Sequence, residues 1–489
     1  MPYKPDFTEQ GVTMITYCNP YRVSYRTAFT RGWILAVFGI VCLVASAATP
    51  DDRIQPWKEN PRFWQYKGKP LLLLGGSDED NLFNNPELMR QNFAVYEEVG
   101  GNYIRSTLSC RDEGNVWPFA KTGDRYDLGQ FNPEFWNRLE TSFREALQRD
   151  IIVQIEVWAT FDFYRDFWLQ NPFNPANNIN YTTENTKLEN EWNHHPASRV
   201  QPFFFSVPGR HDDRVLLKYQ EAFVRKVMEV SLPYPNILYC LDNETRAPVE
   251  WAHYWGRFIQ DEARKQGVTV HVTEMWDVWD IRHEDHKRTY DFPEIFSFVD
   301  ISQNNWQVGQ THYDNLMWFR NMLAKHPGGV RPMNNVKVYG RTRPGEPLIE
   351  QLNLDRWWQN LFAGCASTRF HRPDSGLGAS EPARRAIRAA RTLLAHFDIF
   401  HAEPRPDWLG DREENEAYCL GQASGECAVY FPQGGEVTLQ AAASKTRYEV
   451  RWMNQDTGAF DPPREVPVAN GVLRLQSPDE GRVWIAWVK

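Results

Sequence analysis

Apolar runs alternate with longer amphipathic stretches between residues 60 and 400, and this alternation limits the fold more than any other feature of the sequence. Eight of the runs have the length and composition of buried strands, and helix-like segments separate them. Such an order is typical of βα units, and a count of eight favours a closed (β/α)8 TIM barrel over an open doubly wound sheet. The predicted strands span residues 71–74, 103–108, 151–157, 237–241, 268–272, 296–301, 336–339 and 365–370.

A second pattern begins near residue 403 and continues to the end of the chain at residue 489. Its short alternating runs are separated by Gly, Pro, Asn and Asp turns, which predicts a small antiparallel β-sandwich after a barrel over residues 60–402. Cys419 and Cys427 fall on two neighbouring strands of this domain. They could form a disulfide across a hairpin or serve as two small apolar residues, and the spacing leaves both options open.

The first 48 residues have the pattern of a leader. An apolar segment over residues 33–44 follows three arginines and precedes Ala45-Ser46-Ala47, which predicts a signal peptide cleaved near Ala47 or Ala48. The apolar segment is short for a membrane span. We therefore expect a secreted or periplasmic protein, with an N-terminal membrane anchor as the alternative.

The charge balance and the absence of several motifs exclude other classes. The net charge is −9 and the cations are scattered, whereas nucleic-acid binding needs clustered Lys and Arg. No GxGxxG or Walker sequence follows a predicted strand, no pair of histidines has HExxH spacing, and no GxSxG elbow is present. The sequence therefore predicts neither a cofactor nor a catalytic metal, and a neutral ligand fits the charge best.

The most informative motif is Asp242-Asn243-Glu244, directly after the apolar run 237–241. In parallel α/β folds the carboxyl ends of the strands carry the chemistry. The Asn-Glu pair there resembles the acid/base signature of the clan A glycoside hydrolases, which are retaining β/α-barrel enzymes. The resemblance implies that Glu244 is the catalytic acid and that Asn243 binds a sugar hydroxyl. In the second domain, the segment 448–458 resembles the small β-domains, often called collagen-binding-like, that follow the barrel in secreted bacterial glycosidases.

Glycosidic bond hydrolysis needs a second carboxyl group. Clan A enzymes place a nucleophilic Glu at the end of the seventh strand, but the predicted seventh strand of this chain has none. Glu274 follows the predicted fifth strand and is the expected catalytic partner of Glu244. Glu156, which strand alternation turns into the barrel, and Asp80, which follows the first strand, are the other candidates.

Further side chains at the predicted strand ends are expected to bind substrate. Some carry positive charge or a ring that suits polar contacts, and these are Arg105, Lys337, Tyr339, Arg369 and His371. Trp158 and Trp276 are expected to be sugar platforms, because flat rings stack on pyranose faces. The several cations make an acidic glycan one option for the substrate.

A connection of about 55 residues, 159–213, separates the third strand from its helix. Long ordered loops usually carry function, so we expect this one to form a wall of the substrate cleft, with a purely covering role as the alternative. Taken together, the sequence predicts a glycoside hydrolase that cuts a polysaccharide or oligosaccharide by two-carboxylate chemistry. A non-catalytic glycan-binding barrel and a surface adhesin that uses its C-terminal β-domain are the alternatives.

Overall fold

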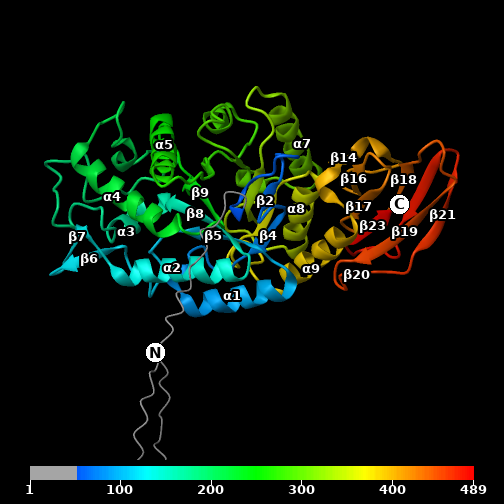
Figure 1. Cartoon of the computed structure of the whole chain (residues 1–489), viewed down its shortest axis with the longest axis horizontal. Coiled ribbons are helices and arrows are strands. Elements are labelled where there is room, and N and C mark those ends of the chain that lie inside the picture. Colours follow the sequence, from blue (N-terminus) through cyan, green and yellow to red (C-terminus); the bar gives the residue numbers. More distant parts are fainter. Residues whose placement is uncertain (1–51) are drawn as a thin grey trace, which may run out of the picture. The chain divides into compact units, whose positions relative to one another are not determined.

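The computed structural model describes residues 52–489, and the predicted leader lies outside them. The described residues belong to one compact unit. The larger part of this unit is a (β/α)8 barrel, which confirms the predicted fold class (Figure 1). Its strands are β4 (Leu73–Gly76), β5 (Tyr103–Thr107), β8 (Ile152–Trp158), β9 (Ile237–Asp242), β10 (Val272–Thr273), β11 (Val299–Asp300), β12 (Met333–Val338) and β13 (Ser367–Phe370).

All eight barrel strands pair in parallel, in the order β10-β9-β8-β5-β4-β13-β12-β11. The two outer strands of this order, β10 and β11, follow each other in the sequence. The backbone amide of Ser297 donates to the carbonyl of Val272 at 3.1 Å, which joins the two across the gap. The parallel arrangement brings every strand end to the same mouth of the barrel.

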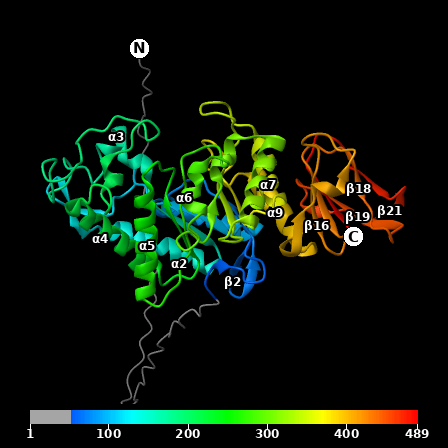
Figure 2. The same ribbon diagram turned by 90° about the horizontal axis from the view of Figure 1, so that it is seen from above.

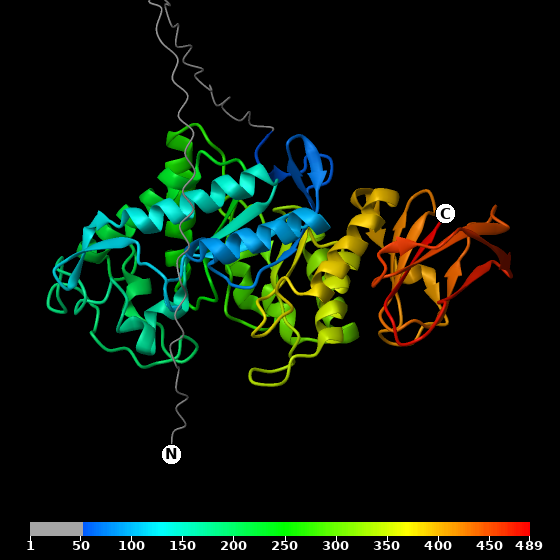
Figure 3. The ribbon, with the colours of Figure 1, turned by 90° about the horizontal axis from the view of Figure 1, so that it is seen from below.

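The helices lie outside the strands, and Figure 3 shows α1 and α2 side by side along one flank of the barrel. Local sequence sets where several begin. Asn85 and Asn132 accept hydrogen bonds from backbone amides in the first turns of α1 and α2, and a proline follows each of these caps. Asp213 caps α4 in the same way. The helices are α1 (Pro86–Val99), α2 (Pro133–Gln148), α3 (Arg165–Trp168), α4 (Arg214–Ser231), α5 (Val249–Lys265), α6 (Lys287–Tyr290), α7 (Gly309–Lys325), α8 (Glu350–Phe362) and α9 (Glu381–His396).

The inside of the barrel is apolar at one end and charged at the other. At the start of the strands, Leu73, Tyr103, Ile152 and Leu238 form an apolar cluster. A small antiparallel sheet of β1 (Gln55–Pro56), β2 (Trp64–Tyr66) and β3 (Lys69–Leu71) contributes Trp64 to this cluster. The ends of the strands instead carry buried Arg, Lys and Glu side chains. The buried charges of the barrel interior therefore gather at the carboxyl ends of these strands.

The C-terminal part is an antiparallel sheet domain whose strands run in the order β14-β16-β17-β23-β19-β21-β22-β18-β15, with β20 paired to β19. Figures 1 and 3 show these orange-to-red strands gathered beside the yellow helices. The side chains of β16 and β17 pack against those of β18 and β22 in one apolar core. Its strands are β14 (Ala402–Pro404), β15 (Leu409–Gly410), β16 (Tyr418–Gln422), β17 (Cys427–Phe431), β18 (Glu436–Gln440), β19 (Arg447–Asn454), β20 (Ala459–Phe460), β21 (Arg464–Ala469), β22 (Val472–Gln476) and β23 (Trp484–Val488).

The barrel and the C-terminal sheet share apolar contacts. Tyr430 of β17 stacks on Trp358 of α8 with ring centroids 5.7 Å apart, and its hydroxyl donates to Asp355. Cys419 and Cys427 are buried free thiols, and the strand register pairs Cys419 with Val429 rather than with Cys427. The two thiols nevertheless lie within hydrogen-bonding distance of each other across β16 and β17, and both are reduced in this structure.

The connection between β8 and α4 is long, as predicted, and contains α3 (Figure 2). A hairpin of β6 (Phe119–Thr122) and β7 (Arg125–Phe131) lies against it through a backbone bridge from Tyr126 to Asn178. Among residues 52–489, no helix combines the length and apolar character needed to cross a bilayer.

Candidate functional site

Four charged side chains occupy the inside of the barrel at the carboxyl ends of its strands. They are Arg105 of β5, Glu156 of β8, Lys337 of β12 and Arg369 of β13, and none is more than 3% exposed. A charge so far from water is stable only beside an opposite charge or a hydrogen-bond partner. The residues therefore form a network, in which the structure brings Arg105, Lys337 and Arg369 together with Glu156.

Arg105 joins two carboxylates at the centre of the network. Its guanidinium pairs with Asp80, and its Nε lies 3.6 Å from Oε2 of Glu156. Burial would raise the pKa of Asp80, but Arg105 and His371 hold that pKa well below its usual range. Burial raises the pKa of Glu156 in spite of Arg105. Asp80 is therefore an ionised counter-charge with little exposure, which suits a structural role.

His371 and Tyr339 border this network. Nε2 of His371 lies 3.4 Å from Oδ2 of Asp80, and Nδ1 contacts the Ser375 hydroxyl at 2.7 Å. The Tyr339 ring packs edge-on against the imidazole with centroids 4.8 Å apart. Arg369 lies 3.6 Å from Asp80. The structure thus brings the cationic and aromatic candidates of strands β5, β12 and β13 into one cluster.

Glu244 lies two residues beyond the end of β9, in the left-handed backbone region with φ of 58°. Non-glycine residues in that region are strained and occur often at functional sites. Its Oε1 lies 2.7 Å from Nζ of Lys337 and accepts a hydrogen bond from Gln303 at 3.1 Å. Lys337 also donates to Oδ1 of Asn243 at 2.6 Å. The Glu244 side chain is 20% exposed, so it is both anchored and accessible.

These contacts fix the charge of Glu244. Burial would raise the pKa of this carboxyl group, but Lys337 and Gln303 overcome that effect and lower it to about 2. A general acid has to hold a proton at the working pH. The Glu244 carboxylate is ionised at neutral pH, so its environment suits a nucleophile or base better than the acid expected from the sequence.

Glu274, the expected partner of Glu244, pairs with a different residue. Its Oε1 lies 2.7 Å from Nη2 of Arg288, and Thr289 donates to its Oε2 at 3.3 Å. The Glu274 side chain has no exposed surface. Arg288 lies 3.6 Å from the centre of the Trp276 ring, and Trp276 is only 9% exposed. The guanidinium of Arg288 pairs with the Glu274 carboxylate and covers one face of the Trp276 indole. Both residues therefore have a packing role around Arg288 in this structure.

We expect Glu274→Gln to lower the free energy of unfolding by about 1–3 kcal/mol, because the buried Arg288 would lose its counter-charge. Turnover by the folded variant should stay within about threefold of wild type, which is well below the hundredfold loss that removing an acid or base causes. Urea unfolding and initial rates measure the two effects. A large loss of turnover without a loss of stability would restore Glu274 as a catalytic residue.

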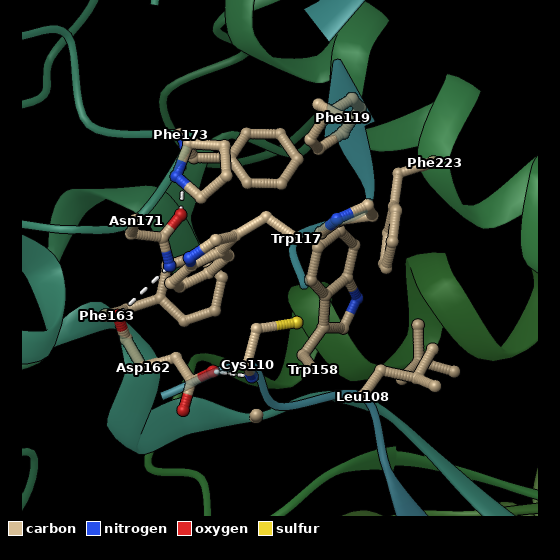
Figure 4. A pocket seen from close by; sticks show the side chains of 14 residues that line it. Leu108, Cys110, Trp117, Phe119, Trp158, Asp162, Phe163, Asn171, Phe173 and Phe223 are labelled. Carbon is tan, nitrogen blue, oxygen red and sulfur yellow. Dashed lines mark hydrogen bonds between the residues drawn. The ribbon is translucent and has the colours of Figure 1, made fainter. Parts of the chain in front are cut away.

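Trp158 is also buried rather than open to the mouth. It is 1% exposed and packs among Phe203, Phe223 and Trp255 on the helix side of β8. Figure 4 shows its indole on the wall of a small cavity lined by aromatic and other apolar side chains together with Asp162 and Asn171. This cavity has a volume of about 30 Å³, which is room for about one or two water molecules and not for a sugar. Phe203 belongs to the long connection, whereas Phe223 and Trp255 belong to α4 and α5. Trp158 therefore points toward the helices, although strand alternation from Glu156 would turn it into the barrel.

The sequence-based set omits three polar side chains near Glu244. Gln303 follows β11, and Asp277 follows β10 by four residues. His195, from the long connection, lies close enough to Arg246 and Glu244 to be affected by both charges. Burial, Arg165 and Arg246 lower the pKa of His195. The position of His195 shows that part of the long connection reaches the mouth. In the sequence, the only signal for these three residues is that each is polar and lies after a predicted strand or within the long connection.

No group of three or more His, Cys, Asp or Glu side chains in residues 52–489 is arranged as a metal site. The fold and the charged mouth define a β/α-barrel protein with an antiparallel C-terminal domain. No family model matches the sequence, and a search of curated proteins finds no match.

Solved structures match the fold over both of its parts. A glycoside hydrolase family 5 protein from Bacteroides vulgatus has a TM-score of 0.61 at 13% identity, over 90% of this chain and 95% of that chain. A protein described as a glycoside hydrolase has a TM-score of 0.58 at 12% identity, over 90% of this chain and 98% of that chain. Since folds host many functions, these low identities establish shared architecture alone.

Proposed function

We propose that this protein is a glycoside hydrolase in which Glu244 is the ionised catalytic carboxylate. The observation that carries the proposal is the position of Glu244 at the barrel mouth, strained in its backbone and held ionised by Lys337 and Gln303. A glycosidase needs such a carboxylate beside the anomeric carbon. The architecture shared with the glycoside hydrolases above supports the same class of reaction.

Lys337 favours a second candidate function, a barrel that binds glycans without cutting them. Clan A enzymes have a nucleophilic Glu at the end of the seventh barrel strand, whereas here β12 presents Lys337. Its ammonium group contacts both Asn243 and Glu244. A binding protein could keep this ion pair permanently closed, whereas an enzyme would expose Glu244 to the sugar.

The full-length protein, incubated with a panel of polysaccharides and oligosaccharides, separates these candidates. Release of reducing ends from one glycan class supports the hydrolase. The panel should contain uronic-acid polymers beside neutral ones, because Arg105, Lys337 and Arg372 bring positive charge to the mouth, each opposed by a carboxylate. Calorimetric binding without release of reducing ends supports the barrel that only binds glycans. If the protein neither cleaves nor binds any glycan of the panel, both candidate functions are contradicted.

A further inference from the structure

The segment after β10 runs beside the end of β9, next to Glu244. Thr245 and Trp276 form a parallel bridge beyond the ends of the two strands. The amide of Thr245 donates to the Met275 carbonyl at 3.1 Å, and the amide of Asp277 donates to the Thr245 carbonyl at 2.9 Å. These bonds fix the backbone of Asp277 beside that of the residue following Glu244, at the mouth of the barrel.

The Asp277 side chain is anchored but not closed off. Arg246 Nε contacts its Oδ2 at 3.1 Å, and the Arg246 guanidinium also donates to the Asp277 backbone carbonyl at 2.9 Å. The Asp277 side chain is 20% exposed, the same fraction as that of Glu244. The ring of Trp279, two residues further on, is 56% exposed. Asp277 therefore belongs to a loop that offers both a carboxyl group and an open aromatic surface.

The surroundings of Asp277 and Glu244 shift the pKa values of the two carboxyl groups in opposite directions. Burial and the nearby negative charge of Glu244 raise the pKa of Asp277 to about 6, although Arg246 and Lys337 oppose the change. Tyr164 also lies close to Asp277, and burial raises its pKa, so that this phenol stays neutral. Lys337 lowers the pKa of Glu244 to about 2 against the effect of burial. A carboxyl pair separated in this way has the charge states of an acid and its ionised partner.

The other carboxyl candidates are less suitable as acids. Glu274 is enclosed by Arg288, and Asp80 is paired with Arg105 and held ionised. Glu156 has no exposed surface and contacts Arg105 and the Thr107 hydroxyl deep in the barrel. Compared with these three carboxyl groups, Glu244 and Asp277 are the more exposed, each with 20% of its side chain accessible.

We propose that Asp277 is the general acid that works with Glu244. The assignment rests on the proposed glycosidase function. The Asp277 O–H bond breaks and gives its proton to the glycosidic oxygen, while the C1–O bond breaks with its electron pair going to that oxygen. Oε2 of Glu244 forms a bond to C1, because Oε1 is occupied by Lys337 and Gln303. The Asp277 carboxylate then removes a proton from water, whose oxygen replaces Glu244 at C1, so that one water is consumed overall.

Asp277→Asn, tested on two kinds of glycoside of the sugar that wild type releases, checks the assignment. We expect a loss of about a hundredfold or more on methyl glycosides or natural glycans, whose leaving oxygen needs a proton. The rate of the variant on dinitrophenyl glycosides should fall much less, because their leaving group departs without protonation. Wild-type activity should fall as the pH rises through about 6, because Asp277 must be protonated, and the variant should lack this fall.

Asp280→Asn, in the same loop, is the matched control and should behave as wild type. Arg246→Gln keeps Asp277 but removes a positive charge that lowers the pKa of Asp277. The alkaline limb of the pH–activity profile should therefore move to higher pH. This second variant tests the assignment even if Asp277→Asn folds poorly. Asp277→Asn with wild-type rates on both substrates, while Glu244→Gln is inactive, would overturn the role of Asp277 and leave the glycosidase intact. Equal loss on both substrates also overturns it, and an inactive wild type removes both proposals.

Discussion

Glu244→Gln is expected to lower kcat for glycan hydrolysis by about a thousandfold or more, since it removes the proposed nucleophile. The amide has nearly the same shape as the carboxylate and retains an oxygen that can accept from Gln303. Glycan affinity should therefore remain within about threefold of wild type, because a group that acts in the transition state contributes little to ground-state binding. Initial rates with the glycan that wild type cleaves and calorimetric titration measure the two quantities.

Glu184→Gln provides the control for this experiment. Glu184 is an exposed residue of the long connection, and its substitution should leave both rate and affinity unchanged. Unchanged hydrolysis in Glu244→Gln would contradict the catalytic role of Glu244. Loss of affinity in parallel with rate would instead point to a binding role for this carboxylate.

The pKa of Glu244 adds a pH dependence to the same prediction. The carboxylate is the active form, and its pKa of about 2 keeps it ionised down to strongly acidic conditions. The acid limb of wild-type activity should therefore lie far below the ordinary pKa of a Glu side chain, which is about 4.3. Replacing Lys337 with Met removes the main charge that lowers this pKa, so the acid limb should shift upward.

The eight barrel strands could be predicted because parallel strands covered on both faces leave long apolar runs in the sequence. Their ends were harder to place. The seventh run was expected to begin at residue 336, whereas β12 begins at Met333 and includes Asn334 and Asn335. Asn334 accepts from the Trp64 indole at 3.0 Å, and Asn335 donates to Asn305 at 3.2 Å. Because these two buried residues are polar, no hydrophobic pattern marks the start of this strand.

The positions of the charged residues could be predicted only to the level of the strand end. Glu244 and Lys337 meet at the mouth because they lie at the carboxyl ends of parallel strands, and Arg105 within β5 is close enough to affect the charge of Glu244. Which carboxyl group remains exposed near Glu244 depends on contacts that sequence spacing does not encode. Glu274 accepts a hydrogen bond from Arg288, which lies 14 residues further along the chain. Asp277 reaches the mouth only because the pairing of β9 and β10 resumes at Thr245 and Trp276 after both strands have ended.

Arg105→Leu is expected to lower the free energy of unfolding by about 3–5 kcal/mol near neutral pH, because it removes the shared partner of two buried carboxylates. Arg105 is completely buried, contacts Asp80 and Glu156, and its positive charge lowers the pKa of both. Leu fills much of the same volume but supplies no charge. Urea unfolding of wild type and variant measures the difference.

The pH dependence of that loss identifies its cause. Without Arg105, the folded-state pKa values of Asp80 and Glu156 rise, so the folded variant binds more protons than the unfolded chain as the pH falls. The variant should therefore gain stability relative to wild type between about pH 7 and about pH 5, and its deficit should shrink. The double variant Arg105→Leu with Glu156→Gln is the matched control, since it removes one of the uncompensated charges and should recover part of the lost stability. A deficit that is equal at both pH values and unchanged in the double variant would mean that Arg105 stabilises the barrel by packing, and that the charge network at the mouth contributes little to its stability.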